Sequence, residues 1–282
     1  MGHPQQVLRK PLAFARSTLK GNLMQSLTKK AIVAATLGGA ALISSAASPS
    51  AADNQKPTVV LVHGAFADGS TWNKVIPMLQ EKGLKVVSVQ NPLTSLADDV
   101  AATRRALDMQ TGPVVLVGHS WGGAVITEAG QHDSVKSLVY VAAFAPSEGQ
   151  SVADLTKDYP TPSGFAHIVV DKEGFLTLSP EGVEKHLAQD LPADQTKLMA
   201  VTQGPVCAKN FEQKVAAAAW KTKPSWYIVS EQDHMIQPAL QAAMATRISA
   251  HVLSLPAGHA PHLSQPAEVA NVILAATNAL VK

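Results

Sequence analysis

Short apolar runs rich in β-branched residues alternate with helix-like stretches along most of the chain after Asp53. The apolar runs lie at residues 58–63, 85–90, 113–119, 135–143, 225–230 and 251–255. The helix-like stretches lie at residues 70–82, 95–109, 121–131, 209–221, 239–248 and 266–280. Such alternation is typical of a parallel sheet covered by helices on both faces. With right-handed crossovers, it predicts an α/β protein with a doubly wound, mainly parallel six-stranded sheet.

One connection, between Ala143 and Ser225, is several times longer than an ordinary loop in such a sheet. Its segment "GFAHIVVDKEGFLTLSP" is typical of a hairpin that turns at residues 171–174, and two short helices follow, separated by Pro192. The connection is too apolar for a disordered linker. We therefore expect a small inserted cap over residues 146–207, between core segments 53–145 and 208–282.

Residues 1–52 have the organisation of an export signal. Lys29 and Lys30 precede the apolar run "AIVAATLGGAALI", and a region of small residues follows. Ser50 and Ala52 suit the small positions before a cleavage site, so we expect a mature protein that starts near Asp53 and is periplasmic or secreted. A transit peptide is the alternative, and Met24 is an alternative start that would give a signal of ordinary length.

Charge and cysteine content narrow the function classes. Six of the 23 basic residues and none of the 21 acidic ones lie in residues 1–52, which leaves 17 basic and 21 acidic residues for the remainder. That remainder has no basic stripe, so we expect no nucleic-acid partner. The single Cys207 can form no internal disulfide, and no Cys/His spacing suggests zinc.

The motif Gly118-His119-Ser120-Trp121-Gly122 directly follows an apolar strand and opens a helix. This strand–turn–helix context is the one in which G-x-S-x-G holds a nucleophilic serine on a strained turn. Glycines two residues before and after Ser120 let strand and helix approach closely. A plain glycine-rich turn is the alternative interpretation.

A serine nucleophile needs a general base and an acid that orients it, and in this arrangement both follow the serine along the chain. Asp233 lies just beyond the strand at 225–230, with Glu231 as the competing acid. His259 lies beyond the last strand, with His262 as the competing base. We predict Asp233 and His259, and expect His262, His251 and His119 to be surface or packing residues.

Backbone N–H groups next to the nucleophile are expected to stabilise an oxyanion. The expected donors are Trp121, beside Ser120, and Ala65, in the loop after the first strand. The chain has no Arg between Arg105 and Arg247 to clamp an anion. We therefore expect an apolar substrate pocket, with lining side chains that include Phe66, Phe165, Phe175 and Met199.

From the strand at 58–63 onward, the chain resembles the α/β-hydrolase superfamily. "HGAFADGSTW", "GHSWGG", "SEQDHMIQP" and "GHAPHLSQP" stand in that family's places and order. More narrowly, it resembles the small-cap branch that holds plant methylesterases, hydroxynitrile lyases and bacterial carboxylesterases, including pyrethroid hydrolases. The lyases of this branch carry Thr and Lys where this chain has Gly64 and Ala260, which disfavours a lyase.

The resemblance and the candidate triad imply a serine carboxylesterase, with no metal or organic cofactor. The lack of Arg between Arg105 and Arg247 and the apolar residues of the cap lead us to expect neutral, apolar carboxylic esters of short to medium size as substrates. The expected partner is a small-molecule ester, with no membrane association after signal cleavage. A ligand-binding module on the same fold, with a lost or slowed catalytic triad, is the alternative from another class. A perhydrolase side activity is a further alternative.

Overall fold

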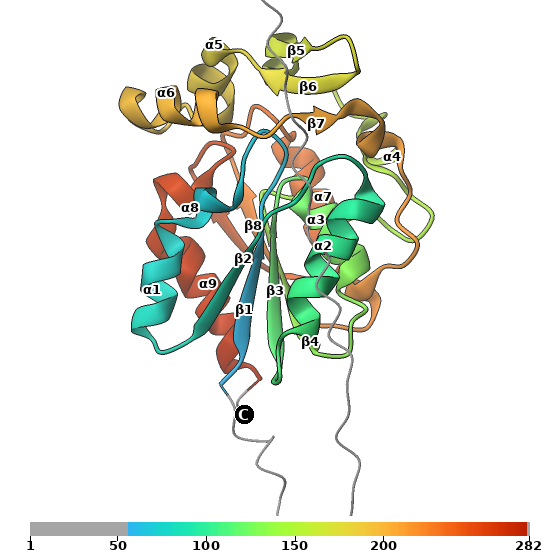
Figure 1. The fold of residues 1–282 in the computed structure, drawn as a ribbon, viewed down its shortest axis with the longest axis vertical. Coiled ribbons are helices and arrows are strands. Elements are labelled where there is room, and N and C mark those ends of the chain that lie inside the picture. Colours follow the sequence, from blue (N-terminus) through green and yellow to red (C-terminus); the bar gives the residue numbers. More distant parts are fainter. Residues whose placement is uncertain (1–55, 281–282) are drawn as a thin grey trace, which may run out of the picture. The chain divides into compact units, whose positions relative to one another are not determined.

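A six-stranded sheet forms the centre of the described structure, with strand order β2-β1-β3-β4-β8-β9 and parallel pairing throughout (Figure 1). The computed structural model describes residues 56–280, so the predicted leader lies outside the described residues. The strands are β1 (Thr58–Val62), β2 (Lys85–Val89), β3 (Val114–His119), β4 (Val135–Val141), β8 (Ser225–Ser230) and β9 (His251–Leu255). This sheet confirms the predicted fold class.

Successive residues of the central strands enter two separate cores, one on each face of the sheet. Val59 and Leu61 pack with α1 (Val75–Glu81) and α9 (Pro266–Asn278). Val60 and Val62 pack on the opposite face. The helices on that face are α2 (Leu96–Asp108), α3 (Gly122–Ala129) and α7 (Pro238–Arg247). Because both faces are covered, apolar residues predominate on both faces of the central strands instead of alternating with polar ones.

The helices depart from the sequence pattern in two places. The stretch 70–82 divides into a 3₁₀ turn at Gly69–Trp72 and helix α1. The predicted helix over 209–221 is wrong: only 3₁₀ turns form there, at Ala208–Glu212 and Ala219–Lys221. Between these turns the backbone of Val215 pairs with Gly149 and Gln150 instead of with its own neighbours. Tertiary hydrogen bonds thus override the helix propensity of this alanine-rich segment.

The long connection between β4 and β8 builds a cap over the carboxyl ends of the strands (Figure 1). It begins with α4 (Val152–Thr156) and a 3₁₀ turn at Ser163–His167. The predicted hairpin is present as β5 (Ile168–Val170) and β6 (Phe175–Leu178). A third strand, β7 (Val206–Cys207), joins β6, and the sequence pattern did not indicate it. The boundaries assigned to the cap from the sequence stay a prediction.

The two short helices of the cap lie on either side of Pro192. The first combines α5 (Pro180–Gly182) with a π-type turn at Val183–Leu187, and the second is α6 (Ala193–Thr202). After the last core strand, a short helix α8 (Pro261–Ser264) precedes α9. Among residues 56–280, no helix is both long and apolar enough to cross a membrane.

The turn between β3 and α3 has a strained backbone and very close neighbours. Ser120 has a φ of 51°, in the left-handed region that few non-glycine residues adopt. A Cβ atom on Gly122 would lie 2.6 Å from the Val62 carbonyl oxygen, and one on Gly118 would lie 2.5 Å from the Gly122 carbonyl oxygen. Only glycine therefore lets α3 start this close to β1 and β3.

We predict that Gly122→Ala lowers the free energy of unfolding by at least about 2 kcal/mol, because backbone atoms cannot move away from the added methyl group. Gly174→Ala is the matched comparison, because Gly174 has a φ of 84° but nothing within 4 Å of an added Cβ. That change should cost about 1 kcal/mol, from conformation alone. Guanidinium denaturation measures both variants, and equal losses would contradict the steric explanation.

Candidate active site

Ser120, His259 and Asp233 form a continuous hydrogen-bonded chain at the carboxyl ends of β3, β9 and β8. His259 Nε2 lies 2.9 Å from Ser120 Oγ, and His259 Nδ1 lies 2.7 Å from Asp233 Oδ2. All three residues are buried beneath the cap. This order of nucleophile, imidazole and carboxylate is the one that activates a serine hydroxyl in acyl-transfer enzymes.

The Asp233 carboxylate is oriented by three donors besides His259. Its Oδ1 accepts the backbone N–H groups of Met235 and Ile236, at 2.7 and 2.9 Å. Its Oδ2 accepts the side-chain amide of Gln241, at 2.7 Å. Gln241 is fully buried and its carbonyl accepts the Ser230 N–H, so it links the carboxylate to β8. Sequence reasoning missed Gln241, and only its polarity on the buried face of α7 was a signal.

Glu231 and His262, the alternative candidates for the acid and the base, do not contact Ser120, His259 or Asp233 through side-chain hydrogen bonds. Glu231 is exposed, and its backbone N–H pairs with the Leu255 carbonyl. His262 is fully buried in α8, where its Nε2 lies 2.7 Å from Thr71 Oγ1 and its ring lies 4.7 Å from the Trp72 ring. Burial, reinforced by nearby cationic groups, lowers the pKa of His262 to about 3. His262 is therefore a neutral packing residue at neutral pH.

His119 contacts the backbone of His259, a role that the sequence did not indicate. Its Nε2–H donates to the His259 carbonyl oxygen at 2.8 Å, and the two rings lie 4.8 Å apart. Burial is the largest cause that holds the pKa of His119 well below its ordinary value, and His262 beside it adds to the effect. A neutral His119 can thus hold the loop that carries His259 without adding charge beside it.

The two expected oxyanion donors lie on either side of Ser120. Ala65 follows β1, and Trp121 is the residue that precedes the first turn of α3. Neither backbone N–H donates a hydrogen bond to another residue within 56–280. A Cβ on Gly64 would lie 2.7 Å from Ser120 Cβ, so the Ala65 loop closely approaches the serine. Two unpaired donors beside a nucleophile are suited to bind a developing oxyanion.

The indole ring of Trp121 is tethered to a buried carboxylate. Trp121 Nε1–H donates to Asp99 Oδ2 at 2.7 Å, and the Leu93 N–H donates to Asp99 Oδ1 at 2.8 Å. The Leu93 carbonyl in turn accepts from the Cys207 N–H and the Asn210 side-chain amide, at 2.9 and 3.1 Å. Asp99 therefore connects the turn that bears Ser120 with the loop that holds the end of the cap.

A cavity of about 230 Å³, which we call the inner cavity, opens above Ser120 and His259. Its walls are mostly apolar, with Phe66, Phe144, Phe165, Phe211, Met235 and Ile236 among them. Of the expected pocket residues, Phe66 and Phe165 line it, whereas Phe175 and Met199 do not. Within residues 56–280, no Asp, Glu, Lys or Arg side chain lines this cavity. The sequence missed Phe211, because that segment was predicted to be a helix.

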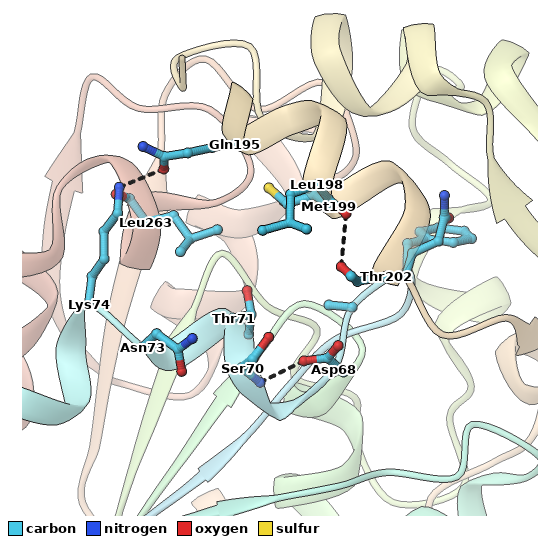
Figure 2. A pocket seen from close by; sticks show the side chains of 13 residues that line it. Asp68, Ser70, Thr71, Asn73, Lys74, Gln195, Leu198, Met199, Thr202 and Leu263 are labelled. Carbon is cyan, nitrogen blue, oxygen red and sulfur yellow. Dashed lines mark hydrogen bonds between the residues drawn. The ribbon is translucent and has the colours of Figure 1, made fainter. Parts of the chain in front are cut away.

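A second pocket of about 270 Å³, which we call the outer pocket, lies between the Gly69–Trp72 turn, α6 and α8 (Figure 2). Phe66 belongs to the walls of both spaces. Met199 lines the outer pocket, and Phe175 lines neither space. Its neighbour Leu176 in β6 lines the inner cavity, and side chains alternate between the two faces of a strand, so Phe175 lies on the other face. In the part of the chain that the structure describes, no cluster of three or more His, Cys, Asp or Glu side chains could hold a metal ion.

We predict that Asp99 makes stability depend on pH. Burial raises the pKa of Asp99 from 3.8 to about 6, although the Trp121 and Leu93 hydrogen bonds act in the opposite direction. The folded state then binds the proton more tightly than the unfolded state, so this stabilisation is present near pH 4 and is lost as the pH rises through about 6. It should amount to no more than about 3 kcal/mol.

The measurement is guanidinium denaturation of the protein and of Asp99→Asn from acid to neutral pH. The wild-type free energy of unfolding should fall relative to that of Asp99→Asn as the pH rises. Asp98→Asn is the neighbouring control. Hydrogen bonds from Ser95 and Thr94 lower the pKa of Asp98, so any contribution of Asp98 to stability should increase, not decrease, as the pH rises. Parallel curves for wild type and Asp99→Asn would contradict the prediction.

Curated relatives share a quarter or slightly more of the sequence over most of the chain. A probable hydrolase from Phoma sp. is 28% identical over 77% of this chain and 97% of its own length. A pyrethroid hydrolase from Sphingobium wenxiniae is 26% identical over 76% of this chain and 85% of its own length. Methylesterase 8 from Arabidopsis thaliana is 25% identical, with coverages of 67% and 77%.

Solved structures show the same fold at lower identity. A pyrethroid hydrolase from Sphingobium faniae superposes with a TM-score of 0.69 at 24% identity, over 79% of this chain and 98% of that one. Polyneuridine aldehyde esterase superposes with a TM-score of 0.67 at 20% identity, over 78% and 99%. The model of the alpha/beta hydrolase family matches residues 59–272, which span the sheet, the cap and the site. The chain therefore belongs to the alpha/beta hydrolase family.

Proposed function

We propose that the protein is a serine hydrolase that cleaves neutral, apolar carboxylic esters of short to medium size through an acyl-enzyme. The observation that carries the proposal is the hydrogen-bonded chain from Ser120 through His259 to Asp233, of which Ser120 and His259 line the inner cavity. Relatives named as hydrolases, methylesterases and a pyrethroid hydrolase support the ester class. A purely ligand-binding role would not require a nucleophile paired with its base in this way.

The proposed reaction begins when Ser120 Oγ attacks the ester carbonyl and His259 Nε2 accepts the hydroxyl proton. Asp233 holds the imidazole in the tautomer with a protonated Nδ1 and stabilises the imidazolium that forms. The backbone N–H groups of Ala65 and Trp121 stabilise the oxyanion of the tetrahedral intermediate. His259 then gives its proton to the departing alkoxide. Water attacks the acyl-enzyme in the same manner and releases the carboxylic acid and Ser120.

The proposed preference for neutral substrates follows from the walls of the inner cavity. Apolar side chains dominate them, and each buried substrate methylene contributes about 0.8 kcal/mol. A carboxylate or phosphate on the substrate would lose its hydration there without gaining a cationic partner. The volume of about 230 Å³ suits short and medium groups, and long triglycerides should be poor substrates.

Export also remains our proposal. It rests on the basic, apolar and small-residue regions within residues 1–52. N-terminal sequencing of the protein recovered from the periplasm or medium tests it, with a new N-terminus near Asp53 as the expected result.

Replacement of the nucleophile or its supporting acid should abolish turnover. A fluorophosphonate should label Ser120 and no other serine, and Ser120→Ala should reduce kcat at least about 10³-fold. Asp233→Asn should cost about 10³- to 10⁴-fold, because the amide favours the wrong imidazole tautomer. The readout is p-nitrophenyl butyrate hydrolysis by each purified variant.

Glu231→Gln is the matched control for Asp233→Asn, because Glu231 is exposed and lies only two residues away. It should retain wild-type kcat. If Ser120→Ala kept wild-type turnover, the proposed mechanism would be wrong, and a loss in Glu231→Gln alone would reassign the acid.

Charge on the acyl group should distinguish substrates. We expect kcat/KM for p-nitrophenyl butyrate to exceed that for the p-nitrophenyl hemiester of succinate by at least about 10²-fold, because the carboxylate would be buried unpaired. Both compounds release the same phenol, so one assay compares them. A preference for the hemiester would overturn the apolar-cavity proposal and indicate an anion site at a cap lysine.

A further inference from the structure

We propose that the outer pocket is a second compartment of the substrate site, separated from the inner cavity by Phe66. It would receive the substrate group that the inner cavity does not hold, and it favours a neutral group that carries a hydrogen-bond acceptor, such as an ether or carbonyl oxygen. This inference rests on the proposed esterase function and deepens it.

The first argument is the size and position of the two spaces. Phe66 lines both of them and is 6% exposed, so one buried side chain forms a wall on each side. The inner cavity, at about 230 Å³, is smaller than the roughly 300–1,000 Å³ of ordinary small-molecule sites. An ester carbonyl at Ser120 carries two groups, one on each side of the ester bond. The inner cavity holds one of them, and the outer pocket of about 270 Å³ is the adjoining space for the other.

The backbone of Phe66 supports a role for its side chain. Its φ is 58°, which costs a residue with a Cβ roughly 1–2 kcal/mol relative to its normal conformation. Glycine would adopt this conformation without that cost. The chain instead places a buried aromatic ring there, next to the expected oxyanion donor Ala65. Strain held at one residue of a ligand-lining loop is typical of a functional position.

The chemistry of the outer pocket indicates the class of group it would take. Figure 2 shows Leu198 and Met199 above the space, and Ser70 and Asn73 below it. The Ser70 hydroxyl and the Asn73 amide are exposed and have no hydrogen-bond partner among residues 56–280, so a ligand could take the place of the water they face. One apolar wall and one wall with unpaired donors fit an apolar chain or ring that carries an acceptor oxygen.

The charged residues of the outer pocket argue against an anionic ligand. Lys74 Nζ already donates to Gln195 Oε1 and to the Leu263 carbonyl, each at 2.8 Å. Asp68 lines the same space and brings a negative charge. The two charges balance, so a neutral group is favoured over a carboxylate or phosphate. The Lys74 bonds also join α6 of the cap to α8 of the core, which keeps this pocket in shape.

The test compares long and short esters in variants that change the outer pocket alone. Leu198→Trp adds volume to a residue that lines the pocket and is 62% exposed, so it should fold. Val201→Trp is the control, on the same helix, 80% exposed and outside both spaces. The acyl arm uses p-nitrophenyl octanoate and p-nitrophenyl acetate, and the alcohol arm uses octyl butyrate and methyl butyrate.

In at least one arm, Leu198→Trp should lower the long-to-short ratio of kcat/KM by about tenfold, because several substrate methylenes lose their burial. Val201→Trp should leave the ratio unchanged. Phe66→Leu, which thins the partition, should raise the ratio in the same arm. Wild type should also prefer a long ester with one chain methylene replaced by oxygen over its hydrocarbon isostere, and Asn73→Leu should reduce that preference.

The outcomes separate this inference from the proposed function. If wild type hydrolyses p-nitrophenyl acetate but Leu198→Trp leaves both ratios unchanged, the outer pocket is no substrate compartment and the esterase proposal stands. Equal losses in Leu198→Trp and Val201→Trp would likewise overturn the compartment. If wild type hydrolyses no ester and Ser120 is not labelled by a fluorophosphonate, the esterase proposal fails and this inference fails with it.

Discussion

The close contact between the Ser120 turn and the strands beside it is the constraint on which the rest of the site depends. A methyl group on Gly64 would lie 2.7 Å from Ser120 Cβ, and one on Gly122 would lie 2.6 Å from the Val62 carbonyl. The absence of these methyl groups allows the left-handed backbone at Ser120 and the immediate start of α3. Ser120 Oγ can then reach His259, and the Trp121 N–H remains unpaired within residues 56–280.

Buried polar side chains hold this contact in a single arrangement. Gln241, His119 and Asp99 are almost fully buried, and each bonds to a different member of the site: Asp233, His259 and Trp121. A buried polar group without a partner is costly, so every such bond makes other arrangements of its partner unfavourable. The network thereby orients the proposed nucleophile, its proposed base and one expected oxyanion donor within the fold. Preorganised dipoles in a water-poor cavity are the most effective form of electrostatic stabilisation.

The six strands were predictable because continuous β-branched runs have few other stable arrangements in a domain with helices on both faces. The absence of a helix over 209–221 was not predictable, because the backbone hydrogen bonds formed there instead involve residues 149 and 150, far away in the sequence. Strand β7 was missed for the same reason, since two residues carry no periodic signal and pair only with β6. Local patterns therefore described the six core strands and the cap hairpin well, but not the segments at 206–207 and 208–221, whose backbone partners lie elsewhere in the chain.

The sequence by itself determined the fold class, the serine turn and the chain order of the candidate acid and base, because these depend on local periodicity and on glycines at close contacts. Only the tertiary structure decided which carboxylate and which imidazole meet Ser120. Asp233 is buried against His259 while Glu231 faces solvent, and His262 turns instead to Thr71. The partition by Phe66, the Asp99 tether and the two pockets also belong to the tertiary structure. Each of them joins residues far apart in the sequence, and no local pattern records which distant side chains will share a wall or a hydrogen bond.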